Sequence, residues 1–437
     1  MRFLASFILT VFIALPAAAD VEIEEVTTPG GLTAWLVEDQ SIPFVALELR
    51  FRGGTSLDLP DKRGAVNLMT GLLEEGAGDL DARAFARSLE GLAASFDYDS
   101  NDDDVSISAQ MLTENRDEVL PLLRQSILEP RFDDSAIERV RQQVLSGLRS
   151  DANDPNEIAS RALSEIAYGD HPYGGPERGT VASVAALTRD DILTAHRAVF
   201  ARDRIYIGAV GDITADELST LLDDLLDGLP ETGAEIPGKV DVSLDGGTTV
   251  VPFDTPQSVA LFAQRGIERN DDDFFPAFVL NHIIGGGGFE SRLMTEVRQK
   301  RGLTYGVYSY LLPKDLAAIY LGSVASANSR VAEAIEVIRA EWDRAATEGV
   351  TVEELDAAKT YLTGAYPLRF DGNSRIATIM VGMQMQGLPI DYIATRNDKV
   401  NAVTLEDVNR VAGELLDPAG LHFVVVGQPE GLPVPTE

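Results

Sequence analysis

Residues 187–212 read LTRDDILTAHRAVFARDRIYIGAVGD, and residues 403–428 read VTLEDVNRVAGELLDPAGLHFVVVGQ. In each stretch a threonine, Thr188 or Thr404, precedes acidic residues, which is typical of the N-cap and first turn of a helix. A run rich in β-branched residues then ends in glycine, at Gly211 or Gly427, and predicts a buried strand. The threonine and the glycine have the same separation in both stretches, which indicates a duplicated unit.

The beginnings of the two units also correspond. Residues 43–51 and residues 258–264 each predict a strand, and a helix is expected after each, at about 62–75 and about 274–284. Strands and long helices are therefore mixed in both units, and we predict an α+β fold of two tandem homologous domains, each a mixed β-sheet with helices packed on it.

The domain boundary is expected where periodicity disappears. Residues 229–242, LPETGAEIPGKVDV, are rich in proline, glycine and acidic residues, so this segment is the predicted linker. The N-terminal domain is then expected at residues 20–228 and the C-terminal domain at residues 243–437.

Composition excludes several classes of function. The 437 residues include 70 acidic and 36 basic ones, giving a net charge of -34, which argues against a nucleic-acid partner and an anionic membrane surface. The chain has no cysteine, which excludes disulfides, thiolate metal sites and a cysteine nucleophile.

The N-terminus predicts export. Residues 1–19 read MRFLASFILTVFIALPAAA, in which Arg2 precedes an apolar run and the small residues Ala17 and Ala19 form an A-x-A cleavage site. The run is short for a membrane span, which favours a cleaved signal peptide over an uncleaved anchor. We expect a periplasmic protein that is not inserted in a membrane.

Two stretches carry a family resemblance. Residues 281–293 read NHIIGGGGFESRL, and residues 296–309 read EVRQKRGLTYGVYS. A glycine-rich turn, then S-R-L, then R-x-x-x-G-L-x-Y is similar to the second half of the insulinase/pitrilysin family of zinc metallopeptidases, which includes the mitochondrial processing peptidases. Residues 171–174, HPYG, add support. The resemblance covers essentially the whole chain after residue 19 and implies two domains closed on each other like a clam.

The resemblance also exposes a deficit. Relatives carry an HxxEH zinc helix in the first half, where two histidines bind zinc and the glutamate activates the metal-bound water. The corresponding segment here, residues 64–76, has Asn67 and Gly71 at the histidine positions and Thr70 at the glutamate position. Glu138 falls where the third ligand lies in relatives, but one carboxylate cannot hold zinc, and a solvated helix residue is the favoured interpretation. We expect no cofactor in this chain.

The substrate-holding half of the family site is present. The resemblance assigns substrate binding to Arg298 and Tyr305, whose side chains can donate hydrogen bonds to a peptide carbonyl or its oxyanion. We expect Gly302 to end the helix that bears Arg298, so that Tyr305 begins the next strand. From spacing alone, a surface arginine and a half-buried strand tyrosine remain the alternative. Gly286 and Gly287 belong to the turn that lines the substrate chamber in relatives, and a flexible turn without function is their alternative.

The acidic segment 97–104, DYDSNDDD, has several interpretations. It does not match an EF-hand loop, because Asp102 and Ser108 occupy the positions that require glycine and glutamate, although a looser calcium site stays open. In the family the segment is an edge strand that pairs with extended peptide, and its acids could select cationic peptides. A turn with merely solvated charges is the alternative.

These observations lead to one functional hypothesis. We expect a non-catalytic, peptide-binding subunit of a heterodimeric zinc peptidase, whose Arg298 and Tyr305 complete the site of a homologous HxxEH-bearing partner that holds the zinc. Two alternatives stay open. One is an autonomous metallopeptidase with a rearranged site that uses Glu138 and a distant histidine, and the other is a non-enzymatic peptide-binding or scaffold protein.

Overall fold

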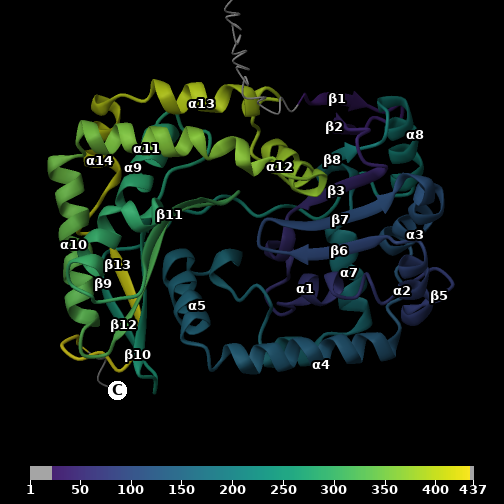
Figure 1. The fold of residues 1–437 in the computed structure, drawn as a ribbon. Helices are drawn as coiled ribbons and strands as arrows, with labels where there is room; N and C mark the ends of the chain where they lie inside the picture. The colour runs from purple at the N-terminus through teal and green to yellow at the C-terminus, as the bar shows by residue number, and fades with distance from the viewer. Residues whose placement is uncertain (1–21, 434–437) are drawn as a thin grey trace, which may run out of the picture.

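The computed structural model describes residues 22–433, so the predicted signal peptide at residues 1–19 lies outside the described residues. Figure 1 shows two halves, each built on one sheet. The N-terminal sheet consists of β1 (Glu24–Thr27), β2 (Thr33–Glu38), β3 (Phe44–Arg52), β6 (Ser95–Ser100), β7 (Asp104–Leu112) and β8 (Ile205–Gly211). The C-terminal sheet consists of β9 (Gly247–Pro252), β10 (Gln257–Arg265), β11 (Val307–Pro313), β12 (Ala318–Ala327) and β13 (His422–Gly427).

Helices cover both sheets. Those of the N-terminal half are α1 (Ala65–Thr70), α2 (Ala82–Gly91), α3 (Arg116–Leu128), α4 (Asp134–Asp151), α5 (Pro155–Tyr168), α6 (Val181–Ala186), α7 (Arg189–Val199) and α8 (Ala215–Leu226), with a short hairpin of β4 (Gly76–Ala77) and β5 (Leu80–Asp81). Those of the C-terminal half are α9 (Phe274–Asn281), α10 (Val331–Glu348), α11 (Val352–Gly364), α12 (Asn373–Met385), α13 (Tyr392–Ala402) and α14 (Leu405–Leu415).

The two sheets share one topology. In space the strands follow the orders β2-β8-β3-β7-β6 and β9-β13-β10-β12-β11, with β1 added at the outer edge of the first sheet. In both, the central strand pairs antiparallel with both neighbours, and the last strand runs parallel to the first. Thr188 and Thr404 each form a capping box, with Asp191 and Asp407. The predicted duplicated α+β fold is therefore confirmed.

Two predicted helices have different ends in the structure. α1 is shorter than expected, because Gly64 precedes it in the left-handed region with φ of 89° and Gly71 follows its last residue. The Asp58 carboxylate accepts hydrogen bonds from the backbone N–H groups of Gly64 and Val66 at 2.7 and 2.9 Å, which fixes the beginning of the helix. The helix expected at 274–284 is α9 up to Asn281 and continues as a π-helical turn, His282–Gly286.

Each half places one helix on the sheet of the other half. In Figure 1, α5 lies beside the C-terminal sheet and α12 beside the N-terminal sheet. Ala159 and Leu163 of α5 share a buried apolar cluster with Val424 of β13. Met380 of α12 shares another with Trp35 of β2. These two clusters join the halves in addition to the separate core within each half.

Residues 229–242, the predicted linker, contain no helix or strand. They run along the junction of the two halves, where the N–H of Val240 donates to the carbonyl of Leu316 at 2.9 Å. The side chains of Ile236, Val240 and Val242 pack against the apolar cluster between α5 and the C-terminal sheet.

Among residues 22–433, no helix has both the length and the apolar character needed to cross a membrane.

Candidate functional site

The segment that carries the HxxEH motif in relatives lies at α1. Its side chains make local hydrogen bonds and packing contacts. The Asn67 amide donates to the Ser100 hydroxyl at 3.4 Å, and the Thr70 hydroxyl donates to the carbonyl of Val66 at 2.9 Å. A Cβ at Gly71 would lie 3.3 Å from a methyl group of Val140 on α4, so the helices are in close contact there. The three positions offer no set of metal ligands.

Glu138 lies on α4 and points to solvent. Its carboxylate accepts hydrogen bonds from Gln142 at 2.7 Å and Arg141 at 3.2 Å, both on the same helix. The hydrogen bond from Gln142 lowers the pKa of Glu138. Within residues 22–433 there is no group of three or more histidine, cysteine or acidic side chains that could hold a metal ion. The donor set of the described residues therefore does not fit zinc.

The four histidines are separated in the structure, each with its own local partner. His171, His196 and His422 bind the carbonyl groups of Gly238, Ile127 and Gly246, at 3.0, 2.7 and 2.5 Å. His282 stacks on the ring of Tyr361 with a centroid separation of 5.0 Å, and burial lowers its pKa. The histidines thus act in packing and backbone contacts.

Arg298 lies on a π-helical segment, Met294–Gln299, and is half-buried. Its guanidinium carbon is 4.5 Å from the centre of the Phe289 ring, an arrangement that holds the cation by cation–π attraction. Phe289 itself is 63% exposed. No carboxylate among residues 22–433 pairs with Arg298.

Tyr305 is 85% exposed and precedes the strand that it was expected to begin. Gly302, with φ of 59°, ends the helical segment as predicted, but β11 starts only at Val307. The cause is a turn at Thr304, whose hydroxyl donates to the carbonyl of Ala325 at 2.6 Å and accepts from the N–H of Gly306 at 3.0 Å. This turn presents Tyr305 to solvent.

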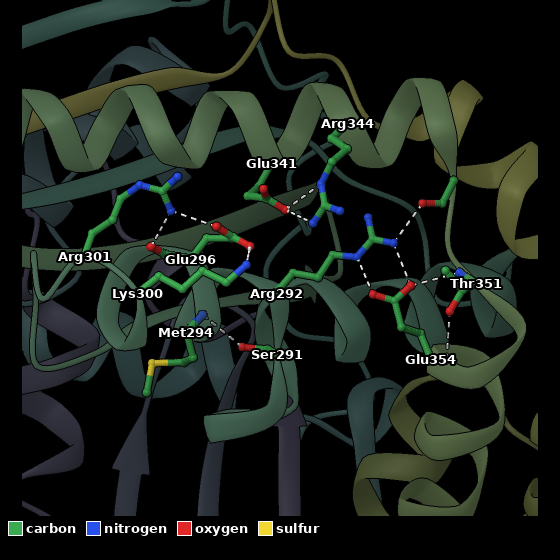
Figure 2. Close-up of polar contacts among 11 residues, drawn as sticks. Ser291, Arg292, Met294, Glu296, Lys300, Arg301, Glu341, Arg344, Thr351 and Glu354 are labelled. Atoms are coloured by element: carbon green, nitrogen blue, oxygen red, sulfur yellow. Dashed lines mark hydrogen bonds and ion pairs between the residues drawn. The ribbon is translucent and has the colours of Figure 1, made fainter.

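A network of ion pairs fixes the segment that bears Arg298 (Figure 2). Arg292 donates to both carboxylate oxygens of Glu354 at 2.6 Å and to the carbonyl of Gly349 at 2.9 Å. Glu296 is bound by Lys300 at 2.6 Å and Arg301 at 2.7 Å. In the sequence Arg292 is visible only as part of the S-R-L motif, because its partner Glu354 lies on another helix.

The glycine-rich turn is also tightly packed. A Cβ at Gly286 would lie 2.7 Å from the amide nitrogen of Asn281, and one at Gly287 would lie 2.7 Å from the carbonyl of His282. Gly286 is exposed and Gly287 is half-buried. At Gly287 the nearest atom belongs to the backbone, so glycine is required there by the packing of the turn, whether or not a peptide approaches it.

The acidic segment divides into two parts with different environments. β6 is the edge strand of its sheet, as the resemblance implies, and Asp97 and Asp99 on it are exposed. Asp102, in the turn after it, and Asp104, at the start of β7, are 4% and 5% exposed. The predictions that these two acids select peptides or are merely solvated are therefore both wrong, because they are buried.

The turn joins the halves of the molecule. Asp102 forms an ion pair with Lys314, which follows β11, and accepts a hydrogen bond from the Thr55 hydroxyl at 3.2 Å. The Asp103 carboxylate accepts from the N–H of Asp315 at 3.2 Å. Contacts between residues this distant in sequence have no local signal.

A duplicated α+β fold that keeps a half-buried Arg298 and an exposed Tyr305 and lacks metal ligands on α1 defines a metallopeptidase-type scaffold with no metal site of its own among residues 22–433. Residues 34–181 match the family model described as insulinase (peptidase family M16), and residues 186–362 match the model described as peptidase M16 inactive domain. The chain belongs to the insulinase family, peptidase family M16, which confirms the resemblance found in the sequence.

Similar proteins agree with this assignment. The "non-peptidase homolog YmxG" of Helicobacter pylori is 28% identical over 97% of this chain and 98% of its own length. The "uncharacterized zinc protease YmxG" of Bacillus subtilis is 23% identical over 90% of this chain and 95% of its own length. A crystal structure of a peptidase M16 inactive domain from Pseudomonas fluorescens superposes with a TM-score of 0.86 at 27% identity, covering 95% of this chain and 100% of that one.

Proposed function

We propose that this chain is the non-catalytic, peptide-binding subunit of a heterodimeric zinc peptidase in the periplasm. Its Arg298 and Tyr305 complete the active site of a homologous partner subunit that carries HxxEH and the zinc. One observation carries the proposal. Arg298 and Tyr305 are presented from a firmly held segment and have no carboxylate partner among residues 22–433, while the segment at α1 lacks both histidines and the glutamate of the family's HxxEH motif.

The chemistry of the pair supports this role. A guanidinium always carries its charge, and a phenol is a neutral donor, so both can bind the carbonyl oxygen of a peptide and its oxyanion during attack by water. The zinc, when bound by the partner, supplies the activated water. This chain's residues orient the substrate and stabilise the charge that develops on it.

A peptide-binding edge fits the same role. The outer side of β6 has no strand paired to it among the described residues, so its backbone groups are available to an extended peptide. Asp97 and Asp99 lie on that strand and are exposed, and they favour a cationic peptide. The predicted signal peptide at residues 1–19 supports the periplasmic location.

The test is reconstitution with an HxxEH-bearing homologue encoded in the same genome. Arg298→Ala and Tyr305→Phe should each lower kcat by at least tenfold, because removing one oxyanion donor typically costs more than that, while the dimer stays intact. Arg265→Ala serves as the matched control for the arginine, since its side chain is exposed and lies on another strand, and Tyr361→Phe, which keeps the ring stacked on His282, controls for the loss of an exposed tyrosine hydroxyl.

Two outcomes contradict the proposal. Full turnover by the Arg298→Ala/Tyr305→Phe double variant would make the chain a scaffold. Stoichiometric zinc together with peptide cleavage in the isolated chain would make it an autonomous enzyme. Size-exclusion chromatography of each mixture distinguishes a lost site from a lost dimer.

A further inference from the structure

A cavity of about 280 Å³ is lined by residues of α9, α12 and α13, three helices of the C-terminal half. Its walls come from α9, α12, α13, the loop after β10 and the turn Tyr366–Arg369. Three arginines line it, Arg269, Arg369 and Arg396, and the remaining lining residues are mostly aromatic or apolar. No aspartate or glutamate contributes to the lining, in a chain that has 70 acidic residues.

The guanidinium groups lie on aromatic faces. The Arg269 guanidinium carbon is 4.2 Å from the centre of the Phe274 ring, and that of Arg396 is 4.5 Å from the centre of the Tyr366 ring. Arg269 also donates to the Tyr392 hydroxyl at 2.6 Å. Planar cations stacked on rings leave their N–H edges directed away from the ring faces, where an oxyanion can accept hydrogen bonds.

The three cations converge without a counter-charge. Burial raises the pKa of the Tyr366 hydroxyl to about 12. The positive charges of Arg396, Arg369 and Arg269 act against that rise, which means that all three guanidinium groups lie near this one hydroxyl. Arg396 is only 4% exposed, and its guanidinium donates to the carbonyl of Leu362 at 2.7 Å and to the Asn397 side chain at 2.9 Å. Within residues 22–433, no carboxylate pairs with any of the three arginines.

Structural packing alone explains this arrangement poorly. Like charges brought together repel, and a buried cation is costly unless an anion is near. Most arginines elsewhere in the chain are paired, as Arg292 is with Glu354. A bound anion would remove the repulsion, and the aromatic walls would cover a flat apolar body.

We infer that this cavity is a binding site for a small aromatic anion, with one carboxylate or phosphate group directed at Arg269, Arg369 and Arg396 and a ring packed against Phe274, Phe278 and Tyr366. The volume admits one ring with a short acidic side chain. The site does not depend on the proposed peptidase role, because it lies on other elements than Arg298 and Tyr305.

The test is isothermal titration calorimetry of residues 20–437 with 3-phenylpropionate and phenyl phosphate. Both should bind, the tighter one identifying the preferred head group, and salt should weaken both. The neutral amide 3-phenylpropionamide and acetate should each bind at least tenfold more weakly than 3-phenylpropionate, since one lacks the charge and the other the ring.

Variants locate the site. Arg369→Ala should weaken binding at least tenfold, because it removes one of the charged donors to the anion. Arg369 is exposed, so its removal leaves the fold intact. Arg269→Ala should act in the same direction. Arg375→Ala, an exposed arginine of α12 that does not line the cavity, should leave binding unchanged. Absence of binding at millimolar anion, equal binding of the amide or of acetate, or an equal loss with Arg375→Ala would overturn the inference.

Discussion

The guanidinium carbon of Arg298 lies 4.5 Å from the centre of the Phe289 ring. The ring belongs to the glycine-rich turn and the arginine to the π-helical segment after it, so the two parts of the family motif are joined by this contact. Because Phe289 is 63% exposed, its ring contributes little to the core and can serve to restrict the arginine.

Phe289→Ala should therefore weaken the function of Arg298 without lowering stability. A cation–π contact at an exposed site contributes about 0.5–1 kcal/mol, so turnover of the reconstituted complex should fall about two- to fivefold. Leu368→Ala removes another exposed apolar side chain, 77% exposed, and should have no effect on turnover. Equal turnover of the two variants would show that Phe289 does not restrict Arg298.

Glu354→Gln should destabilise the segment that bears Arg298. Arg292 has 8% side-chain exposure and donates to both oxygens of Glu354, and hydrogen bonds to charged groups contribute about 1.5–3 kcal/mol. The free energy of unfolding should fall by about 2 kcal/mol in denaturant titration. Glu353→Gln, at an exposed neighbour that forms no ion pair within the described part of the chain, should change it by less than about 0.5 kcal/mol. An equal change in the free energy of unfolding for the two variants would show that the Arg292–Glu354 pair does not stabilise the segment.

The duplicated fold could be predicted because its signals are local. The Thr188 and Thr404 caps and the strands that end at Gly211 and Gly427 lie within short stretches of sequence. The missing zinc ligands at Asn67 and Gly71 are equally visible in the sequence once the family is recognised.

Long-range contacts could not be predicted in this way. The burial of Asp102 depends on Lys314, and the anchoring of Arg292 depends on Glu354. The exposure of Tyr305 depends on a hydrogen bond from the Thr304 hydroxyl to the carbonyl of Ala325 on β12. In each case the partner lies on another element, and the periodicity of one segment contains no information about it.

His196 should lower the free energy of unfolding in acid. Burial lowers its pKa to about 4, below the value of about 6.5 expected in the unfolded chain, so the unfolded state binds more protons between these values. Its contribution to stability is complete above pH 6.5 and decreases, by up to about 3 kcal/mol, as the pH falls to 4. The difference in unfolding free energy between wild type and His196→Gln should therefore shrink, or reverse, over this range.

A variant of a neighbouring ring serves as the control. Phe200 lies 4.8 Å from the His196 ring, centroid to centroid, and Phe200→Leu perturbs the same packing while it keeps the histidine. Its unfolding free energy should run parallel to that of wild type between pH 4 and 6.5. If His196→Gln also runs parallel to wild type, the histidine does not titrate with folding.

α5 packs on the sheet of the C-terminal half and α12 on the sheet of the N-terminal half. Because each half supports a helix of the other, we expect the molecule to unfold as one unit. A Cβ at Gly208 of β8 would lie 2.9 Å from both the Ala377 carbonyl and a Val381 methyl group of α12, whereas the equivalent position in the second repeat is Val424. Gly208→Val should displace α12 and lower the free energy of unfolding by about 1–3 kcal/mol. Gly364→Ala, where nothing lies within 4 Å of the new methyl group, should be neutral or slightly stabilising.

The readout for this prediction is limited proteolysis combined with denaturant titration. With α12 displaced, the halves keep the α5 contact and the polar contacts around Asp102, Asp103 and Asp315 but lose one of their two apolar contacts, so cleavage within residues 229–242 should accelerate and the transition should broaden. A stabilised or unchanged Gly208→Val variant would mean that α12 rests on the N-terminal sheet without holding it. The apolar contact between the halves would then depend on α5, and Lys314→Ala, which removes the ion pair with Asp102, should lower the free energy of unfolding more than Gly208→Val does.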